Sequence, residues 1–179
     1  SIECNGGQSC YGLTIDAPND NELFNFDCTY GTHGCFATTI NCPSNADCNI
    51  DCSSMYGCHS ITVNCPSNTK FQCNAICDGY ESCQNAKFHG KGLISECIGP
   101  RSCVAALLPI PPSNETLTLN CSQWDSCAAT NIRCPSNANC EISCYGSYAC
   151  LDTNITWSST NGTYNTSVTC SSKSACSGF

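Results

Sequence analysis

The chain has 179 residues, of which 22 are cysteines, and its formal net charge at pH 7 is −8. An acidic surface repels phosphate groups, so this charge argues against nucleic acid and against anionic membranes as partners. The sequence has no apolar run of about 18 residues and therefore predicts no membrane span.

The cysteines predict the redox environment of the chain. Their number is even and their share is typical of disulfide scaffolds, which predicts a secreted or cell-surface protein. Asn-X-Ser/Thr sequons, the acceptors of N-linked glycans, point the same way. They lie at Asn114, Asn120, Asn154, Asn161 and Asn165. We expect a secreted glycoprotein with a signal peptide cleaved before Ser1, and no cofactor besides the glycans.

One unit repeats along the whole chain, and we call it the cysteine loop: two cysteines that enclose five residues, or six in the second copy. Cys52 to Cys58 is an example, with Ile50 two residues before it and Val63 five after it. First cysteines of successive loops lie 24, 24, 25, 20, 24, 23 and 26 residues apart, which is the period of a solenoid. The loops are Cys4–Cys10, Cys28–Cys35, Cys52–Cys58, Cys77–Cys83, Cys97–Cys103, Cys121–Cys127, Cys144–Cys150 and Cys170–Cys176.

Apolar residues recur at two positions of the unit, with polar neighbours. This alternation has the period of β-strands. Two residues before the loop stand Ile2, Phe26, Ile50, Ala75, Ser95, Leu119, Ile142 and Val168, with Ile94 beside the exceptional Ser95. Five residues after it stand Ile15, Ile40, Val63, Phe88, Leu108, Ile132 and Ile155. We predict an all-β, disulfide-stapled parallel β-helix, one domain over residues 1–179 with about eight coils of about 24 residues.

Three coils carry a second pair of cysteines at a Cys-Pro-Ser-Asn turn. The other coils lack both members, which indicates that the two bond to each other. We therefore predict eleven local disulfides: the eight cysteine loops plus Cys42–Cys48, Cys65–Cys73 and Cys134–Cys140. Bonds between stacked coils are the alternative, because equivalent cysteines would lie only ~5 Å apart.

Metal and catalytic sites have weak support in the sequence. Zinc sites use reduced cysteines at shorter spacing, so we expect no metal. The best acidic column is Glu3, Asp27, Asp51 and Glu96, in which Asp27 and Asp51 would stack and share calcium or raise a pKa. A solvated face explains the same column. His33, His59 and His89 fall at different positions of the repeat, so we expect no catalytic residues and no enzyme.

Two polar rows bear on other solenoid functions. Asn25, Asn49 and Asn74 align, and we expect them to form an Asn ladder between stacked strands. Thr14, Thr39 and Thr62 form an outward row like that of an ice-binding solenoid, but Lys87 ends it after three coils. Ice binding is therefore not the favoured interpretation.

Several surfaces are candidates for contact with partners. The loop tips form a ridge whose rings could stack on sugars or bind protein, or could cover their own disulfides. Residues 104–112 are the most apolar segment, in which we expect Leu107 and Ile110 to be exposed at a subunit interface, together with Tyr80 and Trp124 from the ridge. All the sequons lie after residue 113, so the N-terminal half would carry no N-linked glycan and could pack against another subunit. The unpaired strand edges at uncapped ends would pair with the strands of another chain. The ridge residues are Tyr30, Met55, Tyr56, Tyr80, Trp124, Tyr145 and Tyr148.

The pattern Cys-Pro-Ser-Asn-X-X-Cys-X-Ile-X-Cys-X5-Cys occurs at residues 42–58 and 134–150. It resembles the cysteine-rich repeats of large surface proteins of algae and other protists. That resemblance implies a glycosylated structural subunit of extracellular fibres, flagellar hairs or walls, with other copies or other extracellular glycoproteins as partners. We expect a self-assembling filament or coat. The alternatives are a monomeric adhesin that binds glycans through the ridge and, behind it, an enzyme-like β-helix.

Overall fold

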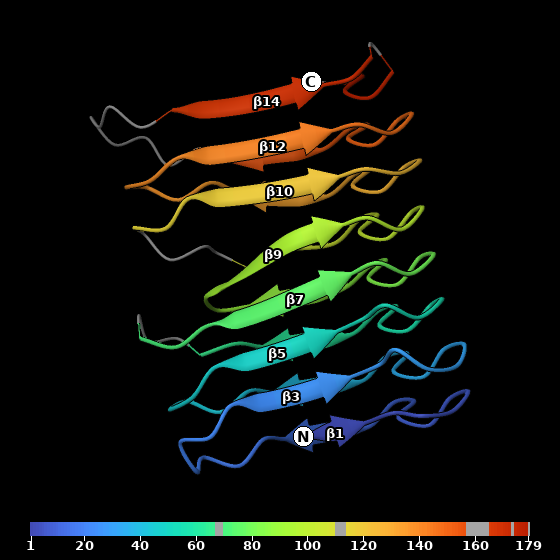
Figure 1. Ribbon diagram of the computed structural model, residues 1–179, viewed down its shortest axis with the longest axis vertical. Helices are drawn as coiled ribbons and strands as arrows, with labels where there is room; N and C mark the ends of the chain where they lie inside the picture. The colour runs from blue at the N-terminus through green and yellow to red at the C-terminus, as the bar shows by residue number, and fades with distance from the viewer. Residues whose placement is uncertain (67–69, 110–113, 157–164, 173, 179) are drawn as a thin grey trace.

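The computed structural model describes residues 1–66, 70–109, 114–156, 165–172 and 174–178, and within them the fold is all-β (Figure 1). Each coil contributes a strand to one long sheet, and most coils contribute a second strand to the opposite face. Paired strands are parallel throughout, which confirms the predicted β-helix. The chain winds upward coil by coil, so strands one repeat apart in sequence lie side by side (Figure 1).

The long sheet has eight strands in the order β1-β3-β5-β7-β9-β10-β12-β14. They are β1 (Ile2–Glu3), β3 (Phe24–Asp27), β5 (Cys48–Asp51), β7 (Cys73–Cys77), β9 (Gly92–Cys97), β10 (Leu117–Cys121), β12 (Cys140–Cys144) and β14 (Thr166–Cys170). The second face carries β2 (Thr14–Asp16), β4 (Thr39–Asn41), β6 (Thr62–Asn64) and β8 (Lys87–His89), then β11 (Asn131–Arg133) and β13 (Asn154–Thr156).

The number of complete coils is lower than the number of cysteine loops. Among the described residues six coils have a strand on both faces, because the fifth and eighth coils lack one on the second face. In the fifth coil Leu107 replaces the strand with two isolated bridges, one to Lys87 and one to Asn131. The second face is therefore continuous across the fifth coil through a single residue.

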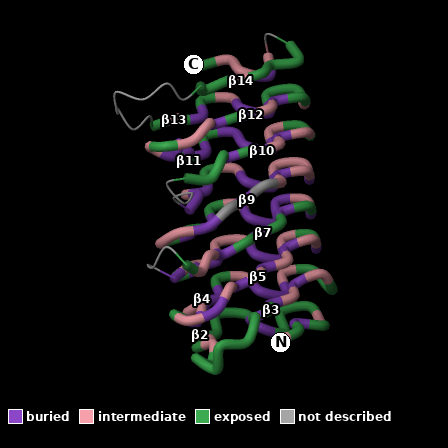
Figure 2. Tube along the Cα trace, turned by 60° about the vertical axis from the view of Figure 1, so that its left-hand side comes forward, coloured by how far each residue is buried: buried purple, intermediate pink, exposed green. Residues whose placement is uncertain are grey.

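The apolar columns form the interior, as Figure 2 shows by the buried residues along the inside of the coils. In the long sheet Phe26 pairs with Ile50, and on the second face Ile40 pairs with Val63. All four are at most 2 % exposed. Burial of alternate residues follows from the pleat, which turns every second side chain inward.

The fifth coil departs from the predicted column. A register shift between β7 and β9 pairs Ala75 with Ile94 and Ile76 with Glu96, so that Ser95 is the extra residue of a β-bulge. Ile94 is 1 % exposed and occupies the inward position. The bulge restores an apolar residue to the column at the one place where the repeat has serine.

Candidate functional site

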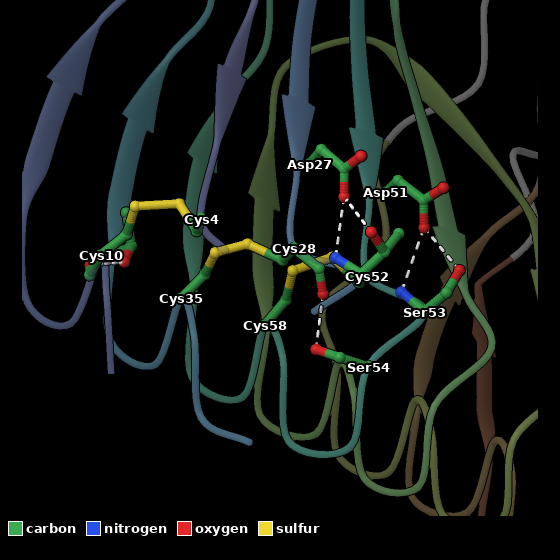
Figure 3. The surroundings of a disulfide bond; sticks show 12 residues. Cys4, Cys10, Asp27, Cys28, Cys35, Asp51, Cys52, Ser53, Ser54 and Cys58 are labelled. Atoms are coloured by element: carbon green, nitrogen blue, oxygen red, sulfur yellow. Dashed lines mark hydrogen bonds between the residues drawn. A yellow bond between two sulfur atoms is a disulfide. The ribbon is translucent and has the colours of Figure 1, made fainter. Parts of the chain in front are cut away.

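All eleven disulfides lie within single coils, in the local pairs expected from the sequence. The structure does not adopt the alternative of bonds between coils. Figure 3 shows three of them, Cys4–Cys10, Cys28–Cys35 and Cys52–Cys58, following one another along the stack. Most of these cysteines are fully buried, so the disulfides form part of the interior as well as cross-linking it.

The first seven cysteine loops share one backbone conformation, and the loops stack into a ridge. In the third loop Tyr56 and Ser60 stand two residues before and after Cys58, and both have positive φ, at 57° and 59°. The amide of Cys58 donates a hydrogen bond to the carbonyl of Ser82 in the next coil. The residue before the second cysteine is buried from Gly34 onward but exposed at Ser9, so the small-residue corner is interior in every coil except the first.

Two residues of the acidic column, Asp27 and Asp51, accept hydrogen bonds in the turns that begin their loops. One carboxylate oxygen of Asp27 accepts hydrogen bonds from the backbone amide and the hydroxyl of Thr29, at 2.8 and 2.5 Å. Asp51 accepts the same pair from Ser53, at 3.1 and 2.5 Å (Figure 3). These contacts hold the chain as it leaves the strand, which is the local bonding that Asp favours at turns.

Asp27 and Asp51 also line a shallow hollow on the outer face of the long sheet, together with the Asn row. Among the described residues, the only groups of three or more potential metal ligands consist of cysteines that are already in disulfides. The only ion pair in that part of the chain joins Arg101 to Glu81 on the ridge, away from the acidic column. The hollow therefore contains neither a cluster of ligands nor a paired base.

The predicted Asn ladder is present. The side-chain nitrogen of Asn49 donates to the side-chain oxygen of Asn25, and Asn74 donates to Asn49, each at 3.1 Å. A second ladder on the other face was not predicted. In it Asn64 donates to Asn41, at 2.6 Å, and Asn41 donates to a carboxylate oxygen of Asp16, also at 2.6 Å. Its sequence signal is a polar residue that recurs six positions after the loop in the first three coils.

The rings of the N-terminal loops stack on one another instead of standing apart. Tyr11 stacks on Phe36 and Phe36 on His59, with centroids 5.4 and 4.8 Å apart and planes within 8° of parallel. His33 stacks on Tyr56 in the same way at 4.6 Å. Phe36 is stacked on both of its faces, so it offers no free ring face to a sugar, whereas Tyr11 at the end of the stack is 54 % exposed.

Titratable groups lie both within this stack and farther along the ridge. Partial burial is the main cause that lowers the pKa of His59. Hydrogen bonding to Tyr80 raises the pKa of Arg101, which also contacts Glu81. Partial burial raises the pKa of Asp125, although Arg101 opposes that shift. These residues link successive coils along the ridge.

The predicted interface residues are not brought together as one exposed patch. Leu107 was expected to be exposed but is half-buried, because its backbone bridges Lys87 and Asn131 within the second face. Tyr80 is half-buried, with its ring edge-on against Tyr56. Trp124 is 49 % exposed. Ile110 lies outside the described residues.

The sequons differ in their surroundings. Asn114, Asn154 and Asn165 are exposed, whereas Asn120 is half-buried within β10. The side chain of Asn154 donates to that of Asn131, at 3.1 Å. Asn161 lies outside the described residues. Where the sequons are described, three of the four therefore have room for a glycan in the folded chain.

The two ends of the stack expose the interior column. Ile2 and Ile15 in the first coil are half-buried, as are Ile155 and Val168 in the last two. Their counterparts in the middle, such as Ile40 and Ile132, are at most 1 % exposed. Figure 2 shows the same difference between the outermost coils and those between them.

Comparison with known protein families, with curated proteins and with solved structures found no match for this chain. The part of the chain that the structure describes has no helix of the length and apolar character needed to cross a membrane. Its many disulfides indicate an oxidising, extracellular type of environment.

Proposed function

We propose that the protein is a secreted structural glycoprotein, a stapled rod that assembles end to end with other copies into an extracellular filament or coat. The observation that carries this proposal is the parallel stack itself, in which each coil pairs in register with the next and holds its own disulfide. Val168 at one end and Ile2 at the other face inward but are only half-covered.

A second copy would continue the existing register. Ile142 pairs with Val168 inside the chain, and Ile2 pairs with Phe26. Placing Ile2 of one copy beside Val168 of another therefore extends the column by one step. The strand edges of β1 and β14 would be hydrogen-bonded at the same time, which removes the exposed polar groups of an edge strand. A contact of this head-to-tail kind does not close on itself and produces a filament.

The rest of the rod suits a mechanical role. Backbone ladders run along both faces, and each coil is cross-linked by its own disulfide. The exposed sequons Asn114, Asn154 and Asn165 would carry glycans on the C-terminal half and leave the N-terminal half bare for packing.

Electron microscopy and light scattering of the glycosylated protein, at rising concentration and without reductant, test this proposal. We expect fibres, and we expect Val168→Asp to abolish them, because it places a charge in the apolar contact. The matched control is Thr169→Asp, which puts the same charge on the outward side of the same strand, leaves the Asn165 sequon intact and should still form fibres. Short rods at every concentration, or fibres that survive Val168→Asp, would contradict end-to-end assembly.

One observation favours a second function, glycan binding. Trp124, Tyr145 and Tyr148 are 49 %, 56 % and 45 % exposed, and no ring stack involves them among the described residues. Their ring faces are available to sugars. A glycan array probed with the monomeric protein, and with Trp124→Ala as the comparison, distinguishes this adhesin from the filament subunit.

A further inference from the structure

Two disulfides in neighbouring coils are in contact with each other. Cys42–Cys48 lies between β4 and β5, and Cys65–Cys73 lies between β6 and β7. Because Cys48 and Cys73 are partners in the parallel register, the two disulfides are stacked. The sulfur of Cys42 is 3.5 Å from that of Cys73, and the sulfurs of Cys42, Cys48 and Cys73 all lie within 4.8 Å of one another.

The four cysteines differ in how far each residue is exposed to solvent. Cys48 and Cys73 are at most 1 % exposed, whereas Cys42 and Cys65 are half-buried at the outer side of the corner. A small thiol therefore reaches Cys42 or Cys65 first. The other group of three close sulfurs, from Cys4, Cys28 and Cys35, is buried throughout.

We propose that this corner is a thiol–disulfide exchange site, at which a small-molecule thiol converts two cross-links within coils into two cross-links between coils. The thiolate attacks the sulfur of Cys65, forms a mixed disulfide with it and releases Cys73 as a thiolate. Cys73 then attacks the sulfur of Cys42, so that a Cys42–Cys73 bond forms and Cys48 is released as a thiolate. Exchange of this kind proceeds by attack of a thiolate on a disulfide sulfur that it can reach.

The last step returns the small thiol. Cys48 attacks Cys65 in the mixed disulfide, forms a Cys48–Cys65 bond and releases the thiolate that began the sequence. Two disulfides are present before and after, so there is no net oxidation or reduction and the thiol acts as a catalyst. The product joins two stacked corners of the rod by covalent bonds, which the native pairing does not do. This chemistry takes place within one chain and does not depend on the proposed filament.

The chain contains a control corner with the same local sequence pattern, although Cys134 is buried, at 7 % exposed, where Cys42 is half-buried. Cys134–Cys140 has the same spacing and the same Pro-Ser-Asn turn. Its neighbours in the long sheet are Leu117 and Thr166, each paired with Cys140, so no second disulfide is stacked on it. Exchange should therefore occur at the first corner and not at this one.

The test is a variant that supplies the attacking thiol without any external reagent. Cys48→Ser leaves Cys42 as a free thiol beside Cys73, and Cys140→Ser leaves Cys134 free as the control. After an acid quench the free thiols are blocked with N-ethylmaleimide, and the chain is cut with trypsin and with a protease that cleaves before Asp. The native Cys65–Cys73 bond joins peptides 51–70 and 71–77, whereas a Cys42–Cys73 bond joins peptides 27–46 and 71–77.

We expect the Cys48→Ser variant to contain the 27–46 to 71–77 linkage, with at least about tenfold more blocked Cys65 than the wild-type protein. The Cys140→Ser control should carry its label on Cys134 alone. Label on Cys42 alone in the Cys48→Ser variant would overturn the proposal.

A second measurement keeps the test independent of how well the variant folds. The wild-type protein is exposed to a low concentration of reduced glutathione, quenched and mapped in the same way. We expect the Cys42–Cys73 linkage here too, while Cys134 and Cys140 stay paired or are labelled as a reduced pair. A map in which both corners contain only native bonds and reduced pairs would contradict the exchange.

Discussion

At the scale of single residues, the corners of the coils hold polar atoms in two different situations. Thr130 is fully buried, and its hydroxyl donates a hydrogen bond to the carbonyl of Cys103. Ser102 is equally buried, but its hydroxyl has no hydrogen-bond partner among the described residues, as is also true of Ser82 and Ser126. A buried polar group without a partner costs free energy, so these serines hold their positions by being small.

Replacing Ser102 with alanine should therefore leave the free energy of unfolding unchanged or raise it by about 1 kcal/mol, because the side chain keeps its size and loses an unpaired hydroxyl. Thr130→Val is the comparison, and it should lower the free energy of unfolding by about 1 kcal/mol through loss of a made hydrogen bond. Denaturant unfolding with the disulfides intact measures both. A Ser102→Ala variant that is the less stable of the two would contradict this account.

At the scale of secondary-structure elements, hydrogen bonds between neighbouring coils hold the short strands in place. The strands of the second face are three residues long, too short for stability alone. Backbone pairing is supplemented by side-chain ladders, in which the amide nitrogen of each Asn donates to the coil before it. The second ladder ends at Asp16, whose carboxylate accepts a hydrogen bond from Asn41. A carboxylate has no N–H group, so the end of this ladder leaves no amide donor without a partner.

Asn49 is the middle residue of the first ladder and makes two of these bonds, whereas Asn74 donates only one. We expect Asn49→Ala to lower the free energy of unfolding by about 1–2 kcal/mol and Asn74→Ala by about half as much, because a typical hydrogen bond contributes about 1 kcal/mol. Both side chains are on the outer face, so neither change opens a cavity. Equal losses in the two variants, measured by urea unfolding, would contradict this account, and no loss in either would show that the ladder adds nothing beyond the strands.

At the scale of the whole molecule, the disulfides fill the part of the buried core that the apolar side chains leave unfilled. The inward columns provide about two apolar side chains per coil, and the cysteines fill much of the remaining core. Small domains with little core of their own commonly depend on such cross-links. Stability should therefore depend on oxidation more strongly than on any one apolar residue.

Full reduction should unfold the rod at ambient temperature, because it removes eleven constraints from the unfolded chain at once. The oxidised rod, by contrast, should withstand heating. Far-ultraviolet circular dichroism, recorded with and without excess tris(2-carboxyethyl)phosphine, measures the loss of β-structure. The control is the same reagent added after its prior oxidation. A β-signal that persists in a fully reduced chain, verified by thiol counting, would mean that the columns alone suffice.

The repeat in the amino-acid sequence was enough to predict the β-helix, the inward columns and the eleven local disulfide pairs. These follow from a period that repeats along the chain, so each coil provides evidence for the others. It also indicated the Asn ladder, because Asn25, Asn49 and Asn74 occupy one position of the repeat.

Features that depend on how one coil meets the next could be seen only in the folded chain. The bulge that passes over Ser95, the face-to-face stacking of Phe36 on His59, and the half-buried state of Leu107 all arise from register between coils. The contact between the sulfurs of Cys42 and Cys73 is of the same kind. The sequence specifies which side chains occupy each position, but distances between coils depend on the twist and register of stacked strands, which no single repeat encodes.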